Sequence, residues 1–386
     1  MQARVKLALA LSTALLAACS SSSNSPRAVP APPATNNNGS PVTAVITARF
    51  DTTAGVIPRP INLLLSGTRD LTLNIPTANP NNFGDPIVAL NTLDGWSTTG
   101  YMRTSFNGEL DGSTLGATTV RVVELYLSNT NKAPAPAAEL PPGVTSPVIR
   151  VLTPGTDYAA QVSPDIDSGG RILSISPLKP LRASTGLINI GYLFIVSNGV
   201  KDTSGNSAAP SSLYAAIKSA PADCSTFTDP TQKGYCQFTK WQLSIAQAVG
   251  VAPANVVVTW SYSTQSVQDT YRALAANVPA QAIGVQPTGL TTKQADARLQ
   301  GKANIYVGTT VVPYYLTKPT STRDRVGLSN VWQAAGPSPV PGLDPTSRNL
   351  TRFNPFPGKT ADATIPLLVT VPNATAAGGA CTKPVA

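Results

Sequence analysis

Residues 50–65, FDTTAGVIPRPINLLL, open the folded part of the chain and set its character. Pro58 and Pro60 each fix their own φ and push the preceding residue toward an extended conformation. The apolar run at residues 61–65 has the length of a buried strand. Residues 72–76 (TLNIP) and 85–96 (DPIVALNTLDGW) follow with the same mixture of apolar and turn residues. This region therefore predicts extended, β-rich structure.

The composition favours an exported β protein. The chain has 386 residues, of which 42% are hydrophobic and 12% charged, with 36 prolines and 29 glycines. The charged fraction is about half the usual ~25%, and the length suffices for two or three compact units. We predict a mainly β fold, with an Ig-like antiparallel β-sandwich at residues 44–208, a small α+β insert at 209–300 and a β-rich segment at 301–386.

Short β patterns at regular spacing support the sandwich. Residues 192–196 (YLFIV), followed by the turn at 198–206 (NGVKDTSGN), resemble the closing strands of bacterial Ig-like domains. The other strands that we predict are at residues 45–48, 119–126, 149–152, 171–175, 303–307, 311–316 and 365–372.

Residues 209–300 show helical spacing. We predict a short helix at 211–220, a longer one that ends at Gly250, a buried strand at 255–262 and a last helix before Pro279. Two apolar stripes are expected to be core rather than ligand contacts. They consist of Phe238, Trp241, Ile245 and Ala248 or Val249 on the longer helix and of Val267, Tyr271, Leu274 and Val278 on the last helix.

Residues 1–19 are expected to be a bacterial lipoprotein signal peptide. Arg4 and Lys6 precede a short apolar core, and small residues lead to Cys19. Cys19 is then diacylated and becomes the first mature residue, which is a stable membrane anchor. The alternative is an ordinary signal peptide with an incidental cysteine. Ser20 rather than Asp follows the cysteine, which favours the outer membrane, in a periplasmic or surface-exposed position. Residues 20–43 are predicted to be a disordered Ser/Pro/Asn linker.

The positive charge is scattered. The net charge is +9, and removal of Arg4 and Lys6 with the leader leaves +7 (9 − 2). The densest cluster, residues 323–325, is interrupted by Asp324. Tracking of phosphates requires clustered cations, so we predict no nucleic-acid partner and a membrane partner only through the lipid anchor.

The sequence contains no histidine, which excludes Ser-His-Asp and Cys-His catalysis by this chain alone. The strained nucleophile elbow of hydrolases needs the pentad Gly-x-Ser-x-Gly. The nearest match, residues 327–331, has Ser329 but Val331 in the last position. Residues 167–170 (DSGG) echo a serine-protease pattern around Ser168, but a hairpin turn is the better interpretation. We therefore predict no catalytic residue in this chain.

Cysteine and aspartate residues suggest structural sites. In an exported chain, Cys224 and Cys236 are expected to form a disulfide, and Cys381 then lacks a partner. Asp165 with Asp167, and the turn from Asp202 to residue 206, offer oxygen ligands to Ca²⁺. Asx turns explain both better, so we predict no cofactor, with calcium as the alternative.

The blocks at residues 50–65, 72–76 and 85–96 resemble the N-terminal domain of bacterial virulence-factor-type extracellular lipases. The chain departs from the family pattern at Arg59, where an apolar residue is usual, and at residues 61–63, where an Asn-Asp pair is usual. Residues 301–373 resemble blocks that precede an α/β-hydrolase core in that family. The resemblance implies a non-catalytic region that supports or displays a lipase catalytic domain.

Three functions remain open at this point. The first is a lipid-anchored envelope protein with a scaffold, display or binding role and no catalysis of its own. The second is a truncated or split carboxylic ester hydrolase whose catalytic half is encoded elsewhere. The third is an adhesin-like surface module. Because histidine is absent, the non-catalytic function is favoured for this chain alone.

Overall fold

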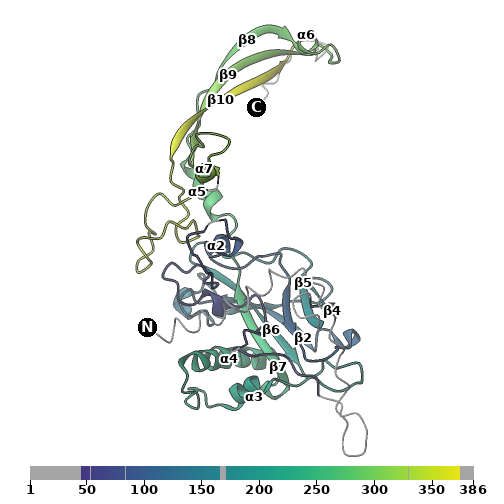
Figure 1. Cartoon of the computed structure of the whole chain (residues 1–386). Coiled ribbons are helices and arrows are strands. Elements are labelled where there is room, and N and C mark those ends of the chain that lie inside the picture. Colours follow the sequence, from purple (N-terminus) through teal and green to yellow (C-terminus); the bar gives the residue numbers. More distant parts are fainter. Residues whose placement is uncertain (1–44, 53, 83, 166–170, 329, 374–386) are drawn as a thin grey trace, which may run out of the picture. The chain divides into compact units, whose positions relative to one another are not determined.

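The computed structural model describes residues 45–373 apart from 53, 83, 166–170 and 329 (Figure 1). In this part of the chain strands contain more residues than helices, which confirms the predicted mainly β fold. The chain divides into two compact units. The first contains the residues up to Asp269 together with Pro339–Ser347 and Thr351–Phe353, and the second contains the remainder.

The first unit has two antiparallel sheets that share one hydrophobic core. The four-stranded sheet has the order β3-β2-β6-β7, and the three-stranded sheet has the order β1-β5-β4. Their strands are β1 (Met102–Ser105), β2 (Val120–Leu127), β3 (Val148–Val151), β4 (Tyr158–Pro164), β5 (Arg171–Pro177), β6 (Asn189–Ser197) and β7 (Val256–Ser263).

Strands β6 and β7 are buried along their entire length because both faces of their sheet are covered. On one face Trp260 stacks on Phe194 with ring centroids 4.9 Å apart, and the Tyr262 hydroxyl lies 3.6 Å from the sulfur of Met102 in β1. On the other face lie the helices α3 (Ser212–Ser219) and α4 (Pro230–Ala248) (Figure 1). This double cover agrees with the unbroken apolar run at residues 192–196 of β6, whereas β7 carries polar residues on the face toward the helices.

Helices α3 and α4 are held on the sheet by a buried hydrogen-bond network. The Tyr214 hydroxyl lies 2.6 Å from Thr259 Oγ1, which donates to Gln242 Oε1 at 2.7 Å. Gln242 Nε2 in turn donates to Ser261 Oγ at 3.2 Å.

Strand β7 comes from the insert predicted at residues 209–300, but it belongs to the same sheet as β2 and β6. The buried face of α4 is partly polar, and the predicted apolar stripe, including Trp241, is only half-buried beside it.

Several sequence predictions are wrong in the structure, among them that of a strand at residues 61–65 and that of a core stripe on the last helix; the predicted strand at 45–48 forms only isolated bridges at Thr47 and Ala48. The apolar run at residues 61–65 is not a strand, because η1 (Asn62–Leu65) is a 3₁₀ turn whose Asn62 side chain accepts a hydrogen bond from Ser263 N at 2.6 Å. The last predicted helix forms as α5 (Asp269–Asn277), but it has no buried residue, and Tyr271 is 66% exposed. Its stripe at Val267, Tyr271, Leu274 and Val278 is therefore not core.

The remaining short elements lie between the strands and helices of the first unit or precede them. Helix α2 is capped by Asp85, whose carboxylate accepts from Ile87 N at 2.9 Å. Such a cap satisfies an amide that would otherwise lack a partner at the start of the helix. The elements are α2 (Pro86–Leu90), η2 (Gly112–Thr114), η3 (Ala137–Glu139) and η4 (Pro253–Asn255).

The second unit is built on a three-stranded antiparallel sheet in the order β10-β9-β8. The two predicted strands at 303–307 and 311–316 are one strand, paired with β10 along its whole length from Ala303↔Pro372 to Tyr314↔Ala361. Pro366 is tolerated in β10 because this strand lies at the edge of the sheet. The elements are β8 (Gly284–Thr291), α6 (Thr292–Ala295), β9 (Ala303–Tyr314), α7 (Arg325–Leu328) and β10 (Ala361–Pro372).

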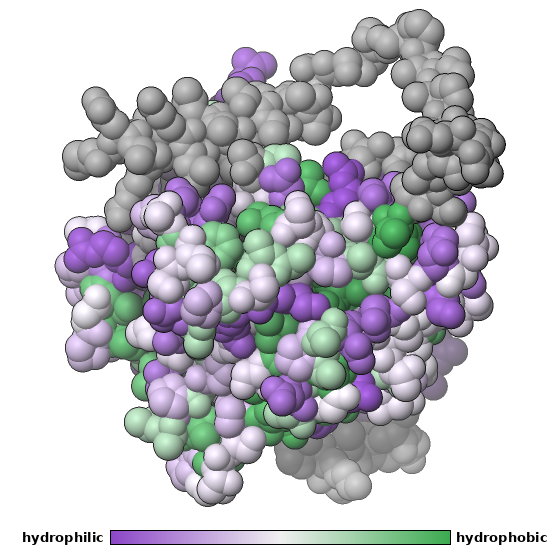
Figure 2. Space-filling view, turned by 90° about the horizontal axis from the view of Figure 1, so that it is seen from below, coloured by the Kyte–Doolittle hydropathy of each residue, from purple (hydrophilic) through white to green (hydrophobic). Residues whose placement is uncertain are grey.

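Within the described residues, no helix combines the length and the apolar character needed to cross a bilayer. On the face shown in Figure 2, hydrophilic and hydrophobic residues are interspersed. The predicted signal peptide, the linker at 20–43 and Cys19 lie outside the described residues. Membrane attachment through Cys19 therefore stays a prediction.

Candidate functional site

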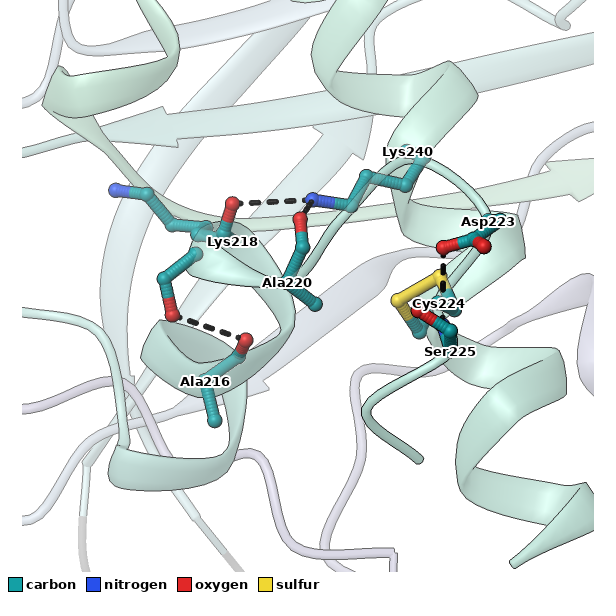
Figure 3. Close-up of a disulfide and its surroundings, with 9 residues drawn as sticks. Ala216, Lys218, Ala220, Asp223, Cys224, Ser225 and Lys240 are labelled. Atoms are coloured by element: carbon teal, nitrogen blue, oxygen red, sulfur yellow. Dashed lines mark hydrogen bonds between the residues drawn. A yellow bond between two sulfur atoms is a disulfide. The ribbon is translucent and has the colours of Figure 1, made fainter. Parts of the chain in front are cut away.

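The predicted disulfide between Cys224 and Cys236 is present, with the two Cα atoms 6.0 Å apart (Figure 3). It joins the loop after α3 to the second turn of α4. Nearby, Lys240 Nζ donates to the carbonyls of Lys218 and Ala220 at the end of α3. A cation at a helix C-terminus satisfies carbonyls that have no partner within the helix. Together these contacts make a structural clamp between α3 and α4.

The predicted calcium ligands have other partners. Asp202 Oδ1 accepts from the backbone amides of Ser204 and Asn206 at 2.9 and 2.8 Å, as an Asx turn does. A hydrogen bond from the Asn206 side chain to the other oxygen is the largest cause that lowers the pKa of Asp202. Asp165 Oδ1 lies 3.4 Å from Arg103 Nη1. In the described part of the chain, no group of three or more His, Cys, Asp or Glu residues is placed to hold a metal.

Several other predicted positions lie outside the described residues: Cys381, Ser329, Asp167 and Ser168. The hairpin turn predicted at residues 167–170 also lies outside the described residues. The antiparallel pairing of β4 with β5 runs up to Pro164↔Arg171, on either side of these residues.

A buried ion pair, which the sequence analysis missed, connects distant parts of the first unit. Arg352 Nη1 lies 3.7 Å from Asp94 Oδ2, with 0% and 3% of the two side chains exposed. The same carboxylate accepts from Arg352 N and from Ser266 Oγ, each at 2.8 Å. The Arg352 guanidinium also lies 4.3 Å from the centre of the Phe353 ring. Residues 351–353 are thereby anchored to the end of the 85–96 segment.

A second buried cation lies near this pair. Lys132 is 6% exposed, and its Nζ donates to Asn129 O at 2.6 Å. Burial, and then the positive charge of Arg352, lowers the pKa of Lys132 to about 7. Arg352 Nη2 donates to Asn129 Oδ1 at 2.8 Å. The cluster has little access to solvent, so we interpret it as structural.

Another buried carboxylate joins β2 to β3. Glu124 is 3% exposed and accepts from Arg150 Nε at 2.9 Å. Arg150 Nη1 also donates to Asp157 at 2.9 Å. Hydrogen bonds from Lys179 and from Thr153 N are the main causes that lower the pKa of Asp157 to about 2. This network pairs every charge that it buries, and it joins Glu124 to Arg150, its direct partner in the pairing of β2 with β3, next to a register shift at Leu125.

The first unit has a surface groove of 560 Å³, here called the Trp96 groove. It lies in the region that opened the sequence analysis, between η1, α2 and the start of β1. Small-molecule sites commonly enclose roughly 300–1,000 Å³ and are lined mostly by apolar side chains. The apolar side chains that line this groove are Pro60, Leu64, Ile75, Ile87, Leu90, Trp96 and Tyr101.

The walls of the Trp96 groove are fixed by hydrogen bonds to the backbone. The Asn91 side chain accepts from Ile75 N at 2.7 Å and donates to Ile75 O at 2.8 Å, which joins the end of α2 to the opposite wall. Trp96 N donates to Ser263 O at 2.9 Å, and Gln265 N donates to Trp96 O at 2.8 Å. These hydrogen bonds hold the two walls of the groove in place.

Two arginines line the same groove. Arg59 and Arg103 are directly opposite each other in an antiparallel bridge, where each amide donates to the other's carbonyl, at 2.9 and 2.8 Å. Like charges in such a cross-strand pair repel each other. The departure of Arg59 from the family pattern was visible in the sequence, but its position opposite Arg103 was not.

The comparison with known families decides the lineage. Residues 32–293 match the family described as bacterial virulence factor lipase N-terminal, and this is more than half of the chain. The chain belongs to this family. The family region contains the whole Trp96 groove and the disulfide. Comparisons with curated proteins and with solved structures found no match.

Proposed function

We propose that this chain is a lipid-anchored envelope protein whose folded part serves a lipase as a non-catalytic binding or scaffold region. Membership in the lipase N-terminal family carries the proposal. The complete absence of histidine from the sequence supports the non-catalytic role, since a serine hydroxyl here would have no imidazole to accept its proton. The apolar Trp96 groove supports a role in binding.

Hydrolysis of short-chain nitrophenyl esters by purified residues 20–386 tests the non-catalytic role. We expect no nitrophenol release above that of buffer. The assay separates this role from that of an ester hydrolase complete in itself.

The proposed anchor is the diacylated thiol of Cys19, which would place the protein at the outer membrane. Its support is the run of small residues before Cys19 and the serine after it. Mass spectrometry of the protein from its native membrane should find diacylglycerol on Cys19. A Cys19→Ser variant should lose this mass and move to the soluble fraction. A free mature N-terminus at another residue would rule out this anchor.

The second candidate function is joint action with an α/β-hydrolase catalytic domain that cleaves carboxylic esters. The observation that favours it is again the family, which is named for the N-terminal part of lipases. The genomic DNA beyond codon 386, or an adjacent reading frame, should encode a Gly-x-Ser-x-Gly pentad followed by a histidine. A neighbourhood without any hydrolase frame would leave only the binding role.

A further inference from the structure

The connection between β8 and β9, residues 289–302, lies at one end of the second unit's sheet and includes α6 (Figure 1). We call it the β8–β9 tip. Its shape is fixed by side-chain hydrogen bonds. Thr291 N donates to Gln294 Oε1 at 2.8 Å, and Thr292 Oγ1 donates to the carbonyl of Gln300 at 3.0 Å. The side chains of the tip are therefore presented on a defined turn.

Large apolar side chains are exposed at this end of the sheet. Leu290 and Leu299 in the tip are 45% and 50% exposed, and Val371 near the end of β10 is 41% exposed. Val371 and Thr291 are both paired with Asn304, so β10 brings its apolar residue next to the tip. None of the residues in β8, β9 and β10 is buried. Exposed apolar groups gathered in this way mark an interaction surface.

The structure also gathers cations at the tip, although positive charge is scattered along the sequence. Lys293 and Lys302 are exposed, and a Cβ built on Gly301 would lie 3.2 Å from the Cβ of Lys293. Among the described residues, neither ammonium group has a hydrogen-bond or ion-pair partner. Arg298, in contrast, is paired with Asp296 at 2.7 Å. The two lysines therefore give the tip an uncompensated positive charge.

The apolar residues lie on both faces of the sheet, which narrows the choice of partner. Leu368 is 71% exposed, and Val371 points to the opposite face because successive residues of a strand alternate. A single protein surface would cover one face, whereas lipid at the end of the sheet would surround both. The only charged residue in the three strands is Asp362, at the other end, and Lys359 Nζ donates to it at 2.8 Å. An anionic lipid surface thus complements both the leucines and the lysines.

We propose that the β8–β9 tip docks on a membrane surface that contains anionic phospholipid, with its two leucines among the headgroups and its two lysines beside lipid phosphates. The proposal rests on the envelope role proposed above and adds a second membrane contact to the anchor at Cys19. A lysine close to such a surface strengthens binding by roughly fivefold. The contact alone is weak, so it orients a protein that is held at the membrane by other means.

Cosedimentation of purified residues 20–386, which lack the acylated cysteine, with lipid vesicles tests the proposal. Vesicles of equal parts phosphatidylglycerol and phosphatidylcholine should bind the protein roughly tenfold more tightly than phosphatidylcholine alone. A rise from ~0.1 to ~0.5 M NaCl should remove most of this preference, because salt screens exposed charges. Equal binding to the two kinds of vesicle, or binding to neither, would overturn the proposal.

Paired charge variants locate the contact. Lys293→Gln/Lys302→Gln should weaken binding to the anionic vesicles by about 25-fold, from roughly fivefold for each lysine. Lys201→Gln/Lys233→Gln removes the same charge from exposed lysines of the first unit and should change binding by less than about twofold, because these lysines are not in the tip. Circular dichroism spectra that match the parent show that the variants are folded. An equal loss in the two folded double variants would overturn the assignment to the tip.

A tryptophan placed in the tip gives a local readout. The emission of Leu299→Trp should shift to shorter wavelength on anionic vesicles and should be quenched by brominated phosphatidylcholine in them. Leu187→Trp, at a leucine of the first unit that is 62% exposed, should show neither effect. A shift that depends on protein concentration without vesicles would overturn the proposal in favour of contact between copies of the chain. Failure of vesicle binding leaves the mass of diacylglycerol on Cys19 untouched, so the anchor and the tip can fail separately.

Discussion

Replacement of Arg352 by methionine should lower the free energy of unfolding of the first unit more than the replacement of Arg171 or of Lys132 by methionine. The substitution retains much of the apolar volume but removes the cation, which leaves the Asp94 carboxylate buried with only its neutral hydrogen-bond donors, among them Ser266. Removing one member of a buried ion pair typically costs about 3–5 kcal/mol. Because neither side chain has appreciable exposure, little of this loss should be recovered through water.

Urea denaturation followed by tryptophan fluorescence measures the effect, since Trp96, Trp241 and Trp260 all lie in the first unit. Arg171→Met is the matched control. Its partner Glu109 is 3.8 Å away and both side chains are largely exposed, so it should change the free energy of unfolding by at most ~1 kcal/mol.

The double variant Asp94→Asn/Arg352→Met should cost less than the sum of the two single variants, because it removes both buried charges. Strict additivity, or a loss below ~1 kcal/mol for Arg352→Met alone, would refute the view that this pair anchors residues 351–353.

Three further changes test other parts of the first unit. Replacing Cys224 and Cys236 together by alanine should cost about 3 kcal/mol in urea denaturation, because the disulfide closes a short loop, and an unchanged midpoint would contradict this. In the folded chain the pKa of Lys132 is lowered to about 7, from 10.5 in the unfolded chain. Between pH ~7 and ~10.5 the unfolded chain therefore binds more protons than the folded chain. The free energy of unfolding should rise with pH over this range, by up to ~1.4 kcal/mol per pH unit. Lys132→Met should abolish that slope in denaturation curves recorded across this range. A Cβ at Gly95 would lie 2.5 Å from a backbone carbonyl carbon, so Gly95→Ala should cost ~1–3 kcal/mol, whereas Gly116→Ala, with open space around it, should be nearly neutral in the same assay.

The parts of the fold that rest on local pattern were predictable. The run that became β6 is apolar throughout because the strand is covered on both faces. Helix α4 ends at Ala248, two residues before the predicted end at Gly250, and glycine is favoured just past a helix end. The disulfide followed from cysteine number and export. In each case the deciding information lies within a few residues or in composition.

The remaining features depend on residues far apart in the sequence. An apolar run of five residues fits a strand and a helical turn equally well, and at Asn62 a hydrogen bond to Ser263 favours the turn. Tyr271 has helical spacing, but spacing does not reveal whether another element covers that face. The Asp94–Arg352 pair joins residues 258 positions apart, and neither residue stands out in the sequence. The Trp96 groove likewise needs four separate segments.

Nitrophenol release from nitrophenyl butyrate by purified residues 20–386 tests the central claim most directly, namely that this member of the lipase N-terminal family has no hydrolytic chemistry of its own. We expect a rate indistinguishable from buffer, because the sequence has no imidazole to take a proton from a serine. A rate above buffer that persists through purification, and that is lost on changing a single serine to alanine, would contradict the claim.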